Sequence, residues 1–420
     1  MQTIATVYPD GTGVVTIDGR PPAHVNTGSV DEARKALLGL VIEHAQHTGQ
    51  AVQVIARDPE SEHRLDVHPD GTVRPIETAG PAAPDPAGQA DGRPHKHSVD
   101  HSPARLVEAG RPQPKTRAEA RSFLTVHEDT RPAEAGWRGF LARLGIKTEP
   151  SPAEKAYRTD VRAVSGHWPG PRTIAVVNGK GGAGKTPTTV LLSALFASHG
   201  GAGVLAWDNN ETRGTLGWRT EQGPHESHVL TMLPYAERLM EPTARAADLA
   251  AYVHHQTVDK FDVLRSNPLM LPHQQRLTAE NFDAVHAVAT KYYRLVFVDS
   301  GNDETAPHWL RMIDHADQLV VATTTRPDHA EAGRLLLDAL RARDAHSEAL
   351  ADQAVVVVSQ ADREEASAAT IAAGFEGLAR TATTIPYDKA MRAPWLRVDN
   401  LTPEAQRAYL AAAAAVAAGL

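Results

Sequence analysis

The glycine-rich stretch GKGGAGKT, residues 179–186, carries four glycines and two lysines before its final threonine. It matches the pattern G-x-x-x-x-G-K-[ST], and it lies between an apolar run typical of a strand and a helical segment. Glycines let successive backbone N–H groups point at phosphate oxygens, and a helix N-terminus adds partial positive charge. The stretch therefore predicts a loop that binds the phosphates of a nucleotide.

Individual residues of this loop have separate predicted tasks. Lys185 is expected to reach the β- and γ-phosphates of ATP, and the Thr186 hydroxyl is expected to ligate Mg²⁺. Pro187 falls in the first helical turn, where a backbone N–H is expendable. The predicted cofactors are thus ATP and Mg²⁺. The residues predicted to contact the nucleotide here are Gly179, Gly181, Gly182, Ala183, Gly184, Lys185, Thr186 and Pro187.

Two further apolar runs end in an acidic residue. RLVFVD ends at Asp299, which is predicted to hold Mg²⁺ through water, and Gly301 just after it marks a loop that responds to the γ-phosphate. GVLAWD ends at Asp208. For Asp208 the residues leave two interpretations open, a catalytic carboxylate or a turn-capping aspartate at a strand end.

The second lysine, Lys180, is not required by a plain phosphate loop. With it, KGGAGKT resembles the deviant Walker A motif of the ParA/MinD family of P-loop ATPases, over roughly residues 171–420. The resemblance implies that Lys180 crosses the interface of an ATP-dependent homodimer and contacts the partner's nucleotide. The alternative is a loop lysine that faces solvent. It also implies that Asp208 orients the attacking water, although Ala206 stands where the family often has a first aspartate.

The same resemblance suggests where the base binds. Ser359 and Gln360 stand where the family frequently has an Asn-Arg pair, and Gln360 is a predicted base contact. The segment TTIPYDKAM resembles the family's loop beside the purine, with Pro386, Tyr387 and Asp388 as predicted contacts. A tyrosine packed into a structural loop is the alternative for Tyr387.

The elements around these motifs predict an α/β P-loop NTPase domain over residues 166–420. Seven β-rich runs alternate with helical segments, and most are continuously apolar, as in a mainly parallel sheet covered by helices. Residues 1–76 predict a small α+β module in the order ββαββ. Residues 77–116 predict a disordered Pro/Ala/Gly-rich linker. Residues 117–165 predict an amphipathic helical segment, in which Trp137, Phe140, Leu141 and Leu144 recur at helical spacing.

Composition excludes several classes of protein. The chain has 420 residues, a formal net charge of -8 and no cysteine, so disulfide frameworks, iron–sulfur clusters and thiolate metal sites are excluded. No apolar run approaches the roughly 20 residues that span a bilayer, and the N-terminus lacks the pattern of a signal peptide. We therefore expect a cytoplasmic protein without an integral membrane segment.

By resemblance, the protein is a slow, partner-stimulated ATP hydrolase that acts as an ATP-driven dimerisation switch. One expected role is the partition or positioning of DNA or other cargo, with nonspecific DNA and an activating protein as partners. Lys389, Arg392 and Arg397 are candidate DNA contacts, although ordinary solvated charges are the alternative. The other expected role is that of an accessory ATPase of a secretion (type VII-like) or transfer machine, which docks partners through the N-terminal module. Residues 136–182 resemble actinobacterial MinD-like ATPases, some of which are associated with type VII secretion.

Overall fold

A computed structural model describes residues 3–17, 20–57, 62–76, 150–210, 214–267 and 277–420. The chain divides into two compact units, residues 1–154 and 155–420. The predicted amphipathic positions Trp137, Phe140, Leu141 and Leu144 lie outside the described residues.

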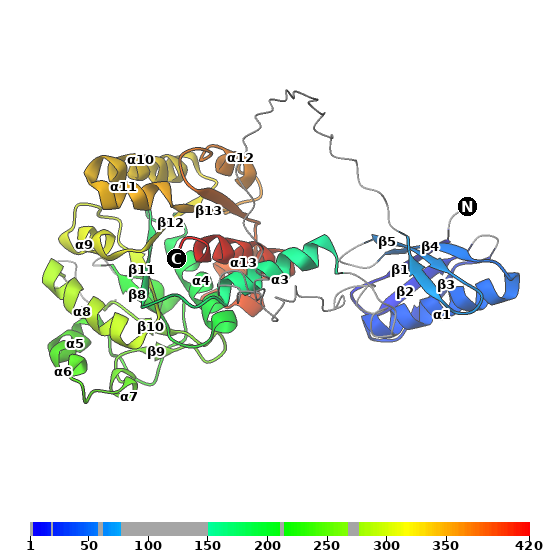
Figure 1. Ribbon diagram of the computed structural model, residues 1–420, viewed down its shortest axis with the longest axis horizontal. Coiled ribbons are helices and arrows are strands. Elements are labelled where there is room, and N and C mark those ends of the chain that lie inside the picture. Colours follow the sequence, from blue (N-terminus) through cyan, green and yellow to red (C-terminus); the bar gives the residue numbers. More distant parts are fainter. Residues whose placement is uncertain (1–2, 18–19, 58–61, 77–149, 211–213, 268–276) are drawn as a thin grey trace, which may run out of the picture. The chain divides into compact units, whose positions relative to one another are not determined.

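The N-terminal unit is a mixed six-stranded sheet with one helix packed on it (Figure 1). The helix α1 (Val30–Thr48) buries Ala33, Leu37 and Val41 in the core of this unit. The strand order is β3-β2-β1-β4-β5-β6, and only β1 and β4 pair in parallel. The strands are β1 (Thr3–Val7), β2 (Thr12–Thr16), β3 (Ala23–Asn26), β4 (Val52–Arg57), β5 (Glu62–Val67) and β6 (Val73–Pro75).

The predicted α+β class of this module is confirmed, but its order is βββαβββ rather than ββαββ. The strand β3 was not predicted, and the run predicted as the last strand, with Asp70 and Gly71 in a turn, forms the two strands β5 and β6. The break repeats the first hairpin turn, because Asp10 and Asp70 each accept hydrogen bonds from the backbone N–H and the hydroxyl of the threonine two residues later. Such local side-chain bonds favour a turn over a continuing strand.

The C-terminal unit contains an eight-stranded sheet of order β14-β13-β12-β7-β11-β8-β10-β9. All neighbouring strands are parallel except the short edge strand β9, which runs antiparallel to β10. The predicted mainly parallel sheet is confirmed, and each of its seven predicted strands is present. The strands are β7 (Arg172–Val177), β8 (Val204–Asn209), β9 (His254–His255), β10 (Asp262–Leu264), β11 (Leu295–Ser300), β12 (Gln318–Thr324), β13 (Val355–Ser359) and β14 (Thr381–Ile385).

Helices cover both faces of this sheet, so the unit has three layers. Along β7 the buried side chains alternate between two cores, with Ala175 and Val177 in one and Ile174 and Val176 in the other. One core includes α8 (Ala279–Tyr292), α9 (Pro307–His315), α10 (Pro327–Arg343) and α11 (Ala345–Asp352). The other includes α4 (Lys185–Gly200) and α13 (Pro403–Ala417). Burial on both faces explains why the strands are continuously apolar rather than alternating.

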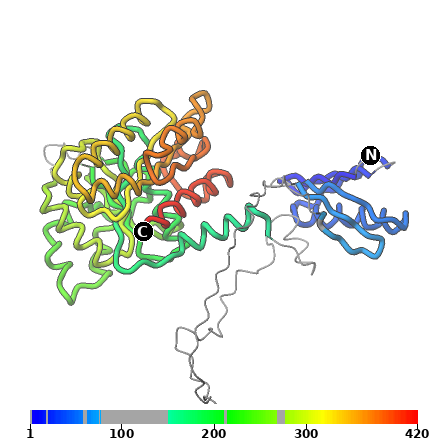
Figure 2. Tube along the Cα trace, turned by 45° about the horizontal axis from the view of Figure 1, so that its top comes forward, coloured from blue at the N-terminus to red at the C-terminus, as the bar shows by residue number. Residues whose placement is uncertain are grey.

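Smaller elements complete the unit. The helix α3 (Pro152–Val164) joins α13, red in Figure 2, through the Arg407–Asp160 ion pair at 3.8 Å and the Arg407 guanidinium above the Tyr157 ring. The remaining helices and turns are η1 (Leu216–Trp218), α5 (Val229–Met232), η2 (Leu233–Tyr235), α6 (Ala236–Met240), α7 (Ala246–Leu249), α12 (Ala368–Ala373), η4 (Lys389–Arg392) and η5 (Val398–Asn400).

A buried histidine makes the stability of this unit dependent on pH. Burial, and then the neighbouring His315, lower the pKa of His286 from its ordinary value of 6.5 to about 4. The unfolded chain therefore binds this proton at pH values where the folded chain does not, so stability is lost as pH falls from 6.5 towards 4. We expect His286→Gln to reduce the loss of unfolding free energy between pH 7 and pH 4.5 by about 1–2 kcal/mol.

Urea unfolding at the two pH values measures this difference. The comparison at pH 7 isolates the packing effect of the substitution, including the contact between His286 and the Thr173 hydroxyl at 2.8 Å. Equal pH dependence in the two proteins would show that His286 does not contribute to acid sensitivity.

Candidate nucleotide site

The loop between β7 and α4 has the backbone that a phosphate-binding loop requires. Gly182 and Gly184 adopt left-handed φ angles of 80° and 91°, which strain any residue with a Cβ. The helix α4 begins at Lys185 immediately afterwards, and Pro187 lies in its first turn. Gly179 lies against the Glu304 carboxylate, and a Cβ at Gly179 would overlap that group. Of the other loop residues, Gly181 is exposed and Ala183 is buried.

Lys185 is held at the centre of this loop. Its ammonium donates hydrogen bonds to the backbone oxygens of Asn178, at 2.8 Å, and Lys180, at 3.0 Å, and to Asn302 Oδ1 at 2.7 Å. Burial lowers its pKa, while Asp299 and Glu304 act in the opposite direction. These bonds fix the buried Lys185 ammonium where the G-x-x-x-x-G-K-[ST] pattern predicts phosphate oxygens. Its charge would act there in surroundings that screen it weakly.

Asn178 and Asn302 are site residues that the sequence reasoning did not select. The buried Asn178 amide donates to the backbone oxygens of Ala322, at 2.8 Å, and His329, at 3.1 Å, and its Oδ1 accepts from the Lys180 N–H at 2.9 Å. It thereby ties the loop to β12 and α10. Asn178 directly follows β7 and Asn302 lies two residues beyond β11, so a polar residue at the end of an apolar strand was the available signal.

Thr186 and Asp299 meet at the end of β11. The Thr186 hydroxyl donates to Asp299 Oδ2 at 2.6 Å and lies 3.2 Å from the Thr215 hydroxyl. Asp299 pairs in the strand register with Asp208 at the end of β8. Both carboxylates are buried, and one oxygen of each has no hydrogen-bond partner.

This donor set fits a divalent cation. Burial raises the pKa of Asp208, with the Asp299 charge as the next cause, and burial also raises the pKa of Asp299. Two buried carboxylates with unpaired oxygens are stabilised by a cation, and Mg²⁺ prefers hard oxygen ligands beside phosphates. Thr186 and Asp299 would hold Mg²⁺, which supplies charge neutralisation at the phosphates.

Asp208 is more enclosed than a catalytic role alone would require. Its Oδ2 accepts from the Ser266 hydroxyl at 2.8 Å, and a Cβ built on Gly214 would overlap the Asp208 carboxylate. Access of water to Asp208 therefore depends on the position of the chain at Gly214. The catalytic role of Asp208 stays a prediction, as does that of Lys180, whose side chain is exposed.

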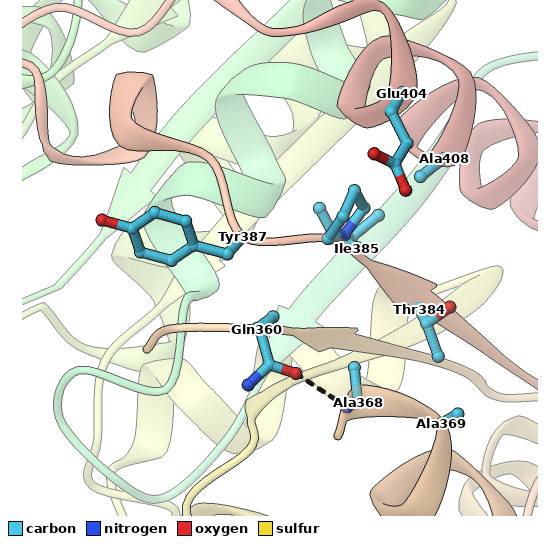
Figure 3. A pocket seen from close by; sticks show the side chains of 9 residues that line it. Gln360, Ala368, Ala369, Thr384, Ile385, Tyr387, Glu404 and Ala408 are labelled. Carbon is cyan, nitrogen blue, oxygen red and sulfur yellow. Dashed lines mark hydrogen bonds between the residues drawn. The ribbon is translucent and has the colours of Figure 1, made fainter. Parts of the chain in front are cut away.

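Three of the residues predicted to contact the base line a pocket to which the phosphate loop does not contribute. Gln360, Pro386 and Tyr387 line an open pocket of about 390 Å³ at the edge strand β14, together with Glu404 and Ala408 of α13 (Figure 3). No residue of the phosphate loop lines it. The Tyr387 ring points away from Glu404 in Figure 3, and its centre lies 5.0 Å from the Arg363 guanidinium and 5.6 Å from that of Arg392.

Two of these predicted base contacts also have structural partners. Gln360 Oε1 accepts from the Ala368 N–H at 2.8 Å, and its amide nitrogen donates to the backbone oxygens of Asp362 and Ala366. Asp388 is buried and accepts hydrogen bonds from the backbone N–H of Ala390 and from Thr402. Base recognition by these residues stays a prediction.

The chain is similar to known secretion-associated and nucleotide-binding proteins. No protein-family model matches it. It is 28% identical over 293 residues to the ESX-1 secretion-associated protein EspI of Mycobacterium tuberculosis, in two strains. The match covers 68% of this chain and 42% of EspI, so the chain spans less than half the length of these curated relatives.

Among solved structures, the ParA family ATPase of Chlorobium tepidum TLS is 18% identical, with 58% of this chain and 98% of that one covered and a TM-score of 0.47. MinD of Pyrococcus furiosus is 16% identical, with 58% and 98% covered and a TM-score of 0.44. The C-terminal unit is an α/β unit with a mainly parallel sheet and a P-loop between β7 and α4.

Within the part of the chain that the structure describes, no helix has the length and apolar character to cross a bilayer.

The close approach of Gly214 to Asp208 gives a test of the site's geometry. Gly214→Ala is expected to displace either the Asp208 carboxylate or the chain at Gly214 and to lower unfolding free energy by about 1–3 kcal/mol. Gly301→Ala is the matched control, because the nearest atom to its new Cβ would be Asn210 Oδ1 at 3.7 Å, an ordinary contact. Thermal unfolding of both variants makes the comparison, and equal stability would contradict the observed packing.

Proposed function

We propose that the chain is a Mg²⁺-dependent ATPase that works as an ATP-driven dimerisation switch. The observation that carries this proposal is the meeting of Lys185, Thr186 and Asp299 at one point, where α4 begins and β11 ends. Phosphoryl transfer needs positioning and neutralisation of phosphate charge more than covalent help from the protein. The loop backbone and the buried Lys185 ammonium provide both, and Thr186 and Asp299 hold the cation.

A dimer would explain the second lysine of the loop. The Lys180 side chain is exposed, although its backbone is fixed by Asn178 and Lys185. A cation that reaches a nucleotide across an interface makes dimerisation depend on the γ-phosphate. ATP would favour the dimer and hydrolysis would release it, because the nucleotide binds the two states with different affinity. Asp208 would orient the attacking water, and an activating protein would accelerate hydrolysis.

Two lysine variants separate binding from dimerisation. Lys185→Ala should weaken ATP binding by roughly 10–100-fold, the value of a charge-assisted bond to phosphate. Lys180→Ala should leave binding within about threefold of wild type and abolish the ATP-dependent dimer. Light scattering after size exclusion in ATP and in ADP measures the dimer, and Lys35→Ala, an exposed lysine of α1, controls for loss of charge. An ATP-dependent dimer that persists in Lys180→Ala would contradict the assigned role.

The cargo of the switch has two candidates. One is DNA, as in partition systems, contacted through Lys389, Arg392 and Arg397. Of these, Arg397 is paired with Glu221 at 2.8 Å, and Arg392 lies over Tyr387, so both already have contacts within the chain. The other candidate is a secretion machine, with partners docked on the N-terminal unit. The similarity to EspI, a secretion-associated protein, favours this second candidate.

Co-sedimentation with nonspecific plasmid DNA distinguishes the two cargoes. Asp208→Ala, which lacks the carboxylate proposed to orient water, is used to maintain the ATP state at two salt concentrations. Binding that requires ATP and falls with salt would support DNA as cargo, because phosphate contacts release counterions. We expect no such binding at a net charge of -8. ATP-dependent, salt-sensitive binding would therefore overturn our preference for the secretion role.

A further inference from the structure

A hydroxyl outside the phosphate loop faces the predicted cation site. Thr215 follows Gly214, the residue that packs on Asp208, and it precedes the short helix η1. Its Oγ1 lies 3.2 Å from Thr186 Oγ1, which is itself 2.6 Å from Asp299 Oδ2. Oxygens from α4, from β11 and from the segment after β8 thus gather at one point.

The spacing of these oxygens suits a shared Mg²⁺ ion. Mg²⁺ binds oxygens in octahedral geometry at about 2.0–2.1 Å, which puts neighbouring ligands about 3 Å apart. The two observed separations, 2.6 and 3.2 Å, lie on either side of this value. Thr215 is exposed, so its side chain can adjust, whereas Asp299 is buried and has an unpaired oxygen.

We propose that the Thr215 hydroxyl is a ligand of the nucleotide-bound Mg²⁺ and that this bond fixes the segment 214–219 in the ATP state. The inference rests on the proposed ATP-binding function and adds a residue to its cation site. It also connects the cation site to the surface of the unit, because the segment after Thr215 leads there.

The connection from Thr215 to that surface is a chain of hydrogen bonds. The Thr215 carbonyl accepts from the N–H groups of Trp218, at 3.0 Å, and Arg219, at 3.2 Å. Arg219 in turn donates from its guanidinium to the Met391 carbonyl at 2.7 Å, and its own carbonyl accepts from the Leu396 N–H at 2.9 Å. Fixing Thr215 therefore restrains the segment 214–219 and, through Arg219, the segment 391–396.

Each of those segments carries an exposed tryptophan. Trp218 is 50% exposed and Trp395 is 48% exposed. A large aromatic side chain left in solvent is sensitive to small movements of its backbone, so Trp218, three residues from Thr215, can report the state of the cation site. The segment is thus a conformational output of nucleotide binding, of the kind that a γ-phosphate and its cation order in other switches.

The test uses Thr215→Val, which replaces the hydroxyl with a methyl group of similar size, and Thr215→Ser, which keeps the hydroxyl. Calorimetry measures binding of AMPPNP with Mg²⁺ and with EDTA. Acrylamide quenching of tryptophan fluorescence, compared with Trp218→Phe to assign the signal, measures the exposure of Trp218. We expect Thr215→Val to reduce the Mg²⁺-dependent gain in affinity by about tenfold, the low end for a residue at a metal site. Binding in EDTA should not change.

Thr215→Val should also remove the change in Trp218 quenching on binding of Mg²⁺ and AMPPNP, and Thr215→Ser should retain both properties. A Mg²⁺ dependence unchanged in Thr215→Val would overturn the ligand assignment. A reduced Mg²⁺ dependence with an intact Trp218 response would overturn the coupling to the segment. A wild-type chain that does not bind AMPPNP and Mg²⁺ would overturn the proposed function itself, and with it this inference.

Discussion

The buried carboxylates of Asp208 and Asp299 impose the constraint on which the nucleotide site depends. Parallel pairing of β8 with β11 sets them opposite each other at the strand ends, and helices on both faces exclude water from them. Two like charges at low dielectric are costly, so one carboxyl takes up a proton or a cation joins the pair. The sheet thus holds an unfavourable interaction that the proposed binding of a cation and nucleotide would relieve.

Lys185 supplies positive charge close to these carboxylates. Its ammonium is fixed by backbone oxygens of its own loop and by Asn302, which follows Asp299 by three residues. The loop after β11 is therefore connected both to Lys185, through Asn302, and to the predicted cation ligand Asp299. The segment at Gly214 has the same property with respect to Asp208. The loop at Asn302 contacts Lys185, and the segment at Gly214 contacts Asp208. A nucleotide bound beside these charged groups would therefore change the contacts of both loops.

Patterns in the sequence predicted the large features well because these depend on local rules. Short apolar runs bounded by turn residues favour strands buried on both faces, and the G-x-x-x-x-G-K-T pattern favours a tight phosphate-binding loop, so the parallel sheet and this loop were predictable. The extra strands of the N-terminal unit were not, because β3 is four residues long and is formed by pairing with β2 rather than by its own composition. The role of Asn178 was not predicted either, because it depends on hydrogen-bond partners 144 and 151 residues away in the sequence.

The residues predicted from motif position to contact the base already have partners within the chain. Gln360 and Asp388 are engaged by backbone groups of their own loops, and Tyr387 is flanked by two arginines. Hydrogen bonds that hold a loop in shape are satisfied before any ligand arrives, so these residues would have to exchange partners to read a base. The phosphate site differs, because Asp208 and Asp299 each retain a buried oxygen without a partner. Two neighbouring buried carboxylates with unpaired oxygens, rather than resemblance of position, support the proposed cation site at the predicted phosphate loop.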